Sequence, residues 1–118
     1  DFVWNSKFPI NSLNIMRGFL SIDTNIKDLY LDIIFDAYWK DNLDTSIDKV
    51  LEPLLKKNNI NSDFFFKGIN NNKIKDELKK VTQEAQDIEI FGAPTFVVNN
   101  KIFWGQDRLE FALDEYSR

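Results

Sequence analysis

The sequence predicts a mixed α/β chain, of α+β order within its 118 residues, in which a helical region precedes a ββα unit. Apolar residues recur at helical spacing over most of the first 90 residues. Two short runs rich in β-branched and aromatic residues, 95–98 and 102–104, then follow on either side of an Asn-rich turn. Helical spacing of apolar residues returns after Gly105, and this last helix completes the predicted ββα unit.

The first two helices are predicted from caps and apolar spacing, after a lead-in of about ten extended residues. Asn11 or Ser12 is expected to cap a helix that ends near position 20. Thr24 and Asn25 are expected to cap a longer helix that ends near position 40. Gly18 is either a weak point in the first helix or a place where another backbone comes close.

Three more helices are expected before the β-rich runs. One begins at Thr45 or Ser46, but Pro53 lies too far along it for the first turn, so we expect a kink or a later start. A short helical segment is predicted to be capped by Ser62. The next helix, at about 72–87, carries apolar residues at core spacing: Ile74, Leu78, Val81 and Ala85.

The two β-rich runs are joined by so short a turn that they predict a β-hairpin. Gln106 or Asp107 then opens the last helix, whose expected apolar face is Leu109, Leu113 and Tyr116. A hairpin by itself is marginally stable in water. We therefore expect this one to pack on helices, or to take partner strands from sequence outside these residues, as in a truncated domain.

Composition excludes several classes of function. The net charge of −4 argues against nucleic-acid binding, which needs a gathered basic surface. The absence of Cys and His removes disulfides, thiolate chemistry and the commonest metal ligands, so no metal site is expected. No apolar run approaches the ~20 residues of a membrane span. We expect no membrane partner and a cytoplasmic location.

Two places in the second half of the chain have the residues of a ligand site. Pro94 either begins a strand as an ordinary trans proline or forms a cis bond that turns the Ala93 backbone toward an extended ligand. At the strand-to-helix junction, unpaired N–H groups and Asp107 would suit a ligand's carboxylate and ammonium. Alternatively, Asp107 only caps the helix and Arg108 is a surface cation. The residues by themselves favour these plainer alternatives.

The chain resembles the DsbA-like thioredoxin family, within it the branch of 2-hydroxychromene-2-carboxylate isomerases and kappa-class glutathione transferases. FGAPTF at 91–96 is similar to the family's cis-proline loop, and FWGQDR at 103–108 is the narrower mark. The resemblance extends through the chain in FP-x-NSL-x-x-MRG from Phe8 to Gly18, in Ala37-Tyr38-Trp39, and in Lys75 and Leu78 before Thr82-x-Glu84-Ala85.

The family fold consists of a thioredoxin βαβ unit, a helical insertion and a ββα unit. The resemblance implies that residues 1–90 are a lead-in and helical insertion and that residues 91–118 are the ββα unit, together one partial domain without the βαβ unit. Glu89 departs from the family, which usually has glycine there.

The resemblance also implies a glutathione site. The Ala93–Pro94 bond would be cis, the Ala93 backbone would pair with the cysteinyl part, and Gln106 and Asp107 would hold the γ-glutamyl end near Trp104. The serine that activates the glutathione thiol in these enzymes has no counterpart here, so no catalytic residue is expected in this chain.

The leading functional hypothesis is a glutathione-dependent isomerase of hydroxychromene-type carboxylates in aromatic degradation, with glutathione and a small aromatic-derived substrate as partners. The parent protein is expected to be an enzyme, isomerase or kappa-class transferase, whereas these residues hold at most half of the site and are expected to be inactive. One alternative is a DsbA-like thiol-disulfide oxidoreductase. The other is a non-catalytic helical module that associates with its own copies through exposed sheet edges and apolar surface, as a homo-oligomer.

Overall fold

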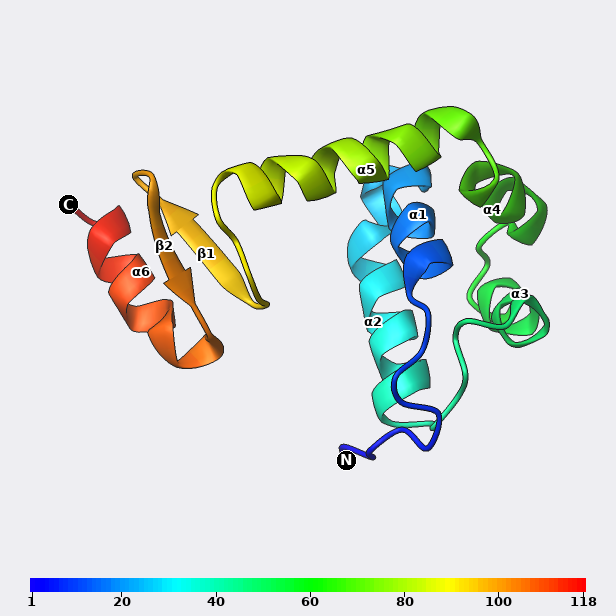
Figure 1. The fold of residues 1–118 in the computed structure, drawn as a ribbon. Coiled ribbons are helices and arrows are strands. Elements are labelled where there is room, and N and C mark those ends of the chain that lie inside the picture. Colours follow the sequence, from blue (N-terminus) through cyan, green and yellow to red (C-terminus); the bar gives the residue numbers. More distant parts are fainter. The chain divides into compact units, whose positions relative to one another are not determined.

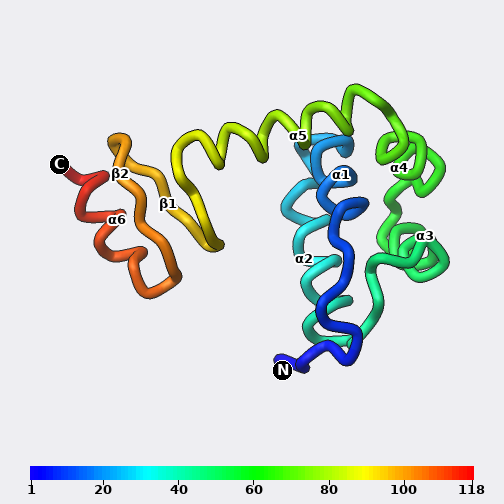
Figure 2. The backbone as a smooth tube through the Cα atoms, in the orientation of Figure 1, coloured from blue at the N-terminus to red at the C-terminus, as the bar shows by residue number.

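The structure is a computed structural model that describes residues 1–118, and its backbone is traced in Figures 1 and 2. It contains two compact units, residues 1–79 and 80–118, which join inside helix α5 (Asn72–Asp87). The resemblance implied a different kind of boundary, after residue 90, between the helical insertion and the ββα unit. That boundary stays a prediction. None of the helices combines the length and the apolar character that crossing a bilayer requires.

The first unit is helical, as predicted. Before α5 it contains four α-helices and one 3₁₀ turn: α1 (Leu13–Ser21), η1 (Thr24–Ile26), α2 (Lys27–Trp39), α3 (Asp48–Lys57) and α4 (Ser62–Ile69). Helix α1 packs on α2 and α4, and α3 packs on α4 (Figure 1). Each predicted helix is therefore present.

Two side-chain caps lie one residue before the predicted position, and the first of them caps η1, whereas the N-cap of α2, Ile26, makes no side-chain hydrogen bond. The carboxylate of Asp23 accepts a hydrogen bond from the Asn25 N–H at 2.8 Å, so η1 begins at Thr24 rather than being capped by it. The side-chain oxygen of Asn61 likewise accepts from the Phe64 N–H at 3.0 Å. Both capping residues are the last with non-helical backbone angles, which is the position from which a side chain reaches the free N–H groups.

Helix α3 begins at Asp48, shortly after the predicted Thr45 or Ser46, and this start still leaves Pro53 beyond the first turn. Pro53 lies inside the helix, where it removes one intrahelical hydrogen bond. Leu51 and Leu55 on either side of it are completely buried, and their packing holds the helix together across that gap.

The core of the first unit is built around Tyr30 and Phe65, whose ring centroids are 5.9 Å apart. The Tyr30 hydroxyl donates a 2.6 Å hydrogen bond to the carbonyl of Ile15, and burial raises the pKa of Tyr30 far above its usual value. A Cβ on Gly18 would collide with the Phe65 ring and would lie 2.7 Å from the Tyr30 oxygen. The close approach at Gly18, one of the two alternatives for this residue, is therefore made by side chains and not by another backbone.

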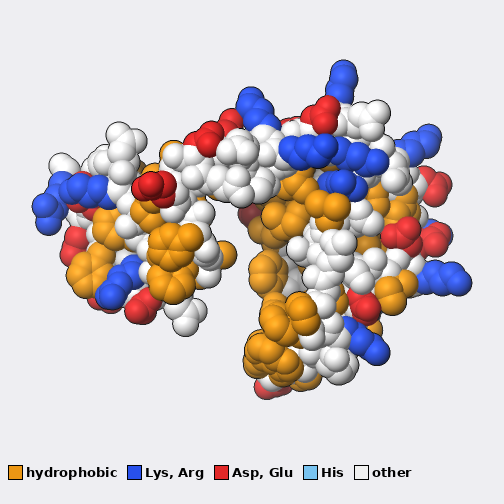
Figure 3. Space-filling model, in the orientation of Figure 1, with side chains coloured by type: hydrophobic (Ala, Val, Ile, Leu, Met, Phe, Trp, Pro, Cys, Tyr) orange, Lys and Arg blue, Asp and Glu red, His pale blue; other side chains and the backbone are white.

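Backbone and side-chain hydrogen bonds attach the amino-terminal segment to the end of α2. The buried Asn5 amide donates to the carbonyls of Tyr38 and Leu43 at 2.8 and 2.9 Å, and the Val3 N–H donates to the Trp39 carbonyl at 2.7 Å. Apolar side chains gather around this segment in Figure 3. They include an aromatic cluster of Phe2, Trp4, Phe8 and Trp39.

The second unit contains the predicted hairpin and the last helix. Strands β1 (Thr95–Val98) and β2 (Lys101–Trp104) pair antiparallel, with Thr95 opposite Trp104. Asn99 and Asn100 form the turn with φ of 50° and 62°, as a two-residue hairpin loop that matches strand twist requires. The turn η2 (Gln106–Arg108) leads into α6 (Leu109–Tyr116), which packs on both strands.

Two expected apolar faces are not buried. No residue of α5 is buried, and Val81 is 45% exposed. On α6 the buried residue is Ala112, whereas Leu109, Leu113 and Tyr116 are exposed. The spacing was correct in both helices, but spacing does not say what packs on a face. The predicted order, helices followed by ββα, is confirmed.

Glu89 explains why the family usually has glycine after this helix. Its φ is 64°, in the left-handed region that glycine enters without strain. The following Ile90 N–H donates to the Ala85 carbonyl at 2.9 Å, a bond that closes the helix end. The helix therefore ends in the usual way in spite of the Glu.

Candidate functional site

The residues expected to bind glutathione lie together. A pocket of about 490 Å³ in the second unit is lined by all five of them and by two neighbours: Ala93, Pro94, Trp104, Gly105, Gln106, Asp107 and Arg108. This volume is in the usual range for small-molecule sites, ~300–1,000 Å³. The loop before β1 and the turn after β2 meet here because the hairpin places Thr95 opposite Trp104.

The Ala93–Pro94 peptide bond is cis. Neither the N–H nor the C=O of Ala93 makes a hydrogen bond within the chain, whereas the Pro94 carbonyl accepts from the Gly105 N–H at 2.9 Å. That bond ties the loop to the opposite side of the pocket. The structure thus offers one free backbone donor and one free acceptor beside each other, as an extended peptide-like ligand requires.

Trp104 forms a wall of the pocket. Its indole lies against Gly92, where a Cβ would clash with the ring nitrogen, and its ring centroid is 5.1 Å from that of Phe91. Trp104 is nevertheless 52% exposed, so much of the ring remains open to a ligand.

The turn after β2 depends on Gly105. Its φ is +103°, and a Cβ there would lie 2.5 Å from Oδ1 of Asp107. Glycine therefore lets the Asp107 carboxylate fold back over the turn. No acidic or amide side chain caps the helix here, so Asp107 does not act as the simple cap that was the plainer alternative.

Arg108 is a pocket residue that the sequence did not single out. It lines the pocket, and its guanidinium carbon lies 5.4 Å from the centre of the Phe111 ring. In the sequence, Arg108 is the last residue of the FWGQDR motif and lies next to Asp107, a position that also fits a surface cation.

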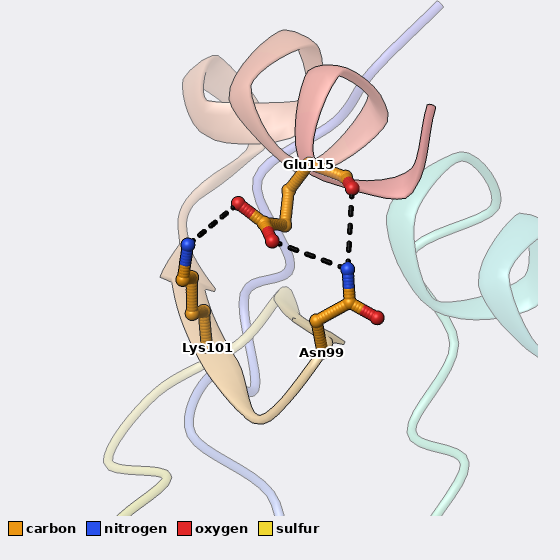
Figure 4. Close-up of polar contacts among 3 residues, drawn as sticks. All are labelled: Asn99, Lys101 and Glu115. Atoms are coloured by element: carbon orange, nitrogen blue, oxygen red, sulfur yellow. Dashed lines mark hydrogen bonds and ion pairs between the residues drawn. The ribbon is translucent and has the colours of Figure 1, made fainter. Parts of the chain in front are cut away.

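Three polar residues hold the hairpin against α6, away from the pocket (Figure 4). The Glu115 carboxylate forms a 2.8 Å ion pair with Lys101 and accepts a 3.1 Å hydrogen bond from Asn99, whose amide also reaches the Glu115 carbonyl at 3.3 Å. The hydrogen bond from Lys101, followed by that from Asn99, lowers the pKa of Glu115. These contacts connect the turn of the hairpin to the end of the helix.

The first unit has an apolar pocket of its own, of about 520 Å³, between the lead-in and helices α1 and α2. Most of its lining is aliphatic or aromatic, including Met16, Phe35 and Trp39. Nowhere in the chain do three or more potential metal ligands of the His, Cys, Asp or Glu type gather.

Comparison with known proteins agrees with this architecture. Among solved structures, a selenomethionine form of 2-hydroxychromene-2-carboxylate isomerase superposes with a TM-score of 0.82 at 21% identity, a likeness that shows the fold. The match covers 99% of this chain and 57% of the isomerase chain. No curated protein matches the sequence. A profile of the DSBA-like thioredoxin domain matches residues 1–117, and the chain belongs to that family.

Proposed function

We propose that this chain binds glutathione, as part of a glutathione-dependent isomerase similar to 2-hydroxychromene-2-carboxylate isomerase. The observation that carries the proposal is the single pocket lined by Ala93, Pro94, Trp104, Gln106 and Asp107. The solved isomerase, which shares the fold, supports the choice of reaction.

The pocket suits the chemistry of glutathione. The free N–H and C=O of Ala93 match the backbone of a cysteinyl residue. The Asp107 carboxylate is an acceptor for the γ-glutamyl ammonium, and the Gln106 amide offers a donor and an acceptor beside it. Trp104, which packs against Phe91, forms one side of the pocket.

Glutathione, if these residues hold it, would supply a thiol nucleophile for reversible addition to a conjugated substrate, which would allow rotation about the bond that isomerises. The residues of this chain contribute binding and orientation, which lower the barrier by fixing the reacting groups in place. No residue here matches the serine that activates the thiol in the family, so we expect binding without turnover.

Calorimetric titration with glutathione tests the proposal. Asp107→Asn is expected to weaken binding about tenfold or more, since it removes a charge-assisted hydrogen bond. Asp114→Asn is the matched control, because Asp114 is exposed on α6 and does not line the pocket. Equal affinity of the wild-type chain and Asp107→Asn would rule out the γ-glutamyl role. No heat and no shift of pocket resonances with wild type would rule out the glutathione site.

Self-association remains the second candidate, because large apolar side chains are exposed. Phe91 is 74% and Tyr116 78% exposed, and both edges of the two-stranded sheet lack a further strand. Sedimentation equilibrium over a hundredfold range of concentration distinguishes a homo-oligomer from a monomer. A single monomeric mass at every concentration would exclude self-association.

A further inference from the structure

Phe91 and Gly92 begin the FGAPTF segment, but neither of them lines the pocket of the second unit. Both instead lie against Trp104, the one aromatic residue of the pocket lining. The proposed function gives these two residues no role. Their contacts with the indole indicate what they do for the site.

The ring of Phe91 supports Trp104 from one direction. The two ring centroids are 5.1 Å apart and the ring planes are tilted by 53°, a separation at which aromatic pairs attract. Trp104 is 52% exposed, so its indole has an open side as well as a supported one. Phe91 is 74% exposed, and its replacement therefore leaves no cavity in a core.

Gly92 supports the indole from its backbone, and it has to be glycine for reasons of space. A Cβ there would lie 2.4 Å from the indole nitrogen and 3.1 Å from two ring carbons. Its φ is not positive, so the backbone conformation does not require glycine. The Thr95 hydroxyl donates a hydrogen bond to the Gly92 carbonyl, which fixes the glycine relative to β1. The indole therefore rests on a fixed stretch of backbone.

We propose that Phe91 and Gly92 are positioning residues, which hold the indole of Trp104 in one orientation before a ligand arrives. The hairpin already fixes the backbone of Trp104, because this residue pairs with Thr95. A ligand that meets an ordered ring does not lose affinity by ordering it. The inference rests on the proposed function, because the ligand that contacts Trp104 is taken to be glutathione.

The test combines calorimetric titration with glutathione and the NMR order parameter of the Trp104 indole N–H in the unliganded chain. Phe91→Ala should lower the order parameter and weaken glutathione about two- to tenfold, because the ligand must then immobilise the ring. Phe91→Tyr keeps an aromatic ring and should retain both wild-type values. Gly92→Ala should shift the indole resonance and weaken binding, because the methyl group displaces the ring.

Tyr116→Ala is the matched control. Tyr116 is 78% exposed in the same unit and does not line the pocket, so its loss should change neither measurement. Phe91→Leu, which keeps an apolar side chain without the ring, repeats the test if Phe91→Ala disturbs the amide spectrum of the hairpin.

The outcomes separate the two proposals. If wild type binds glutathione and the variants without the Phe91 ring bind it equally well, the positioning role is overturned and the glutathione site stands. An unchanged order parameter in those variants would also overturn it, because the ring would then be held without Phe91. If wild type does not bind glutathione, the proposed function fails, and the positioning role fails with it.

Discussion

The two units of the chain differ in what holds them together. The unit of residues 1–79 has a core in which Tyr30, Leu51, Leu55 and Phe65 are all but completely buried. The unit of residues 80–118 buries one apolar residue, Ala112, at 3% exposure. Yet the candidate site lies in the second unit. Apolar burial is therefore concentrated in one unit and ligand chemistry in the other.

The second unit relies on directional contacts in place of a core. The Gly105–Pro94 hydrogen bond joins the two sides of the pocket, and Glu115 joins the turn of the hairpin to α6. Hydrogen bonds contribute ~1 kcal/mol each, whereas a buried Phe contributes several. We therefore expect substitutions in the first unit to change global stability and those in the second to change local order and binding.

The largest expected effect is that of Phe65→Ala. Phe65 is completely buried against Gly18 and Tyr30, so its removal leaves a cavity and should lower the free energy of unfolding by about 3–5 kcal/mol. Phe64→Ala is the matched control, because Phe64 is 59% exposed and its removal should change stability little. Urea unfolding followed by circular dichroism measures both. Similar losses for the two variants would contradict the placement of the core.

A smaller effect is expected for Gly105→Ala in the second unit. Alanine at φ +103° is strained by about 1–3 kcal/mol, and its methyl group would displace the Asp107 carboxylate. Glutathione binding should weaken, while the helical unit keeps its hydrogen-exchange protection. NMR hydrogen exchange follows both units at once. Wild-type exchange and affinity in this variant would show that the turn does not need glycine.

The smallest expected effect concerns Glu115. Its pKa is lowered by Lys101 and Asn99, so its contribution to stability is present above the pKa of an unfolded glutamate and is lost as pH falls through the lower folded value. A carboxyl-carbon NMR titration should place Glu115 below the usual ~4.3. Lys101→Met should raise it toward that value. An unchanged midpoint in Lys101→Met would mean that the ion pair does not hold the hairpin on α6.

Much of the fold followed from local residue patterns. The Asn99–Asn100 turn between two β-rich runs specified the hairpin, and apolar spacing specified α5 over the residues where it lies. The caps at Asp23 and Asn61 were missed by one residue because Thr24 and Ser62 are equally good capping types. Local patterns cannot choose between such neighbours.

What packs on a face was not in the sequence. Val81 and Leu113 have core spacing but are exposed, since burial depends on partners elsewhere in space. The grouping of Ala93 with Asp107 came from family resemblance and not from spacing, because the hairpin register had to be known first. Arg108 was missed because charge alone does not distinguish a ligand contact from a solvated surface.

The position of Trp104 gives the protein a built-in optical reporter. Of the three tryptophans, Trp4 and Trp39 lie 5.8 Å apart in the helical unit, and Trp104 stands by itself in the pocket wall. Replacing the first two with phenylalanine would leave one fluorophore whose emission responds to the polarity of the pocket alone. Arrival of any ligand there would then be visible as a change in colour of emitted light, without a label.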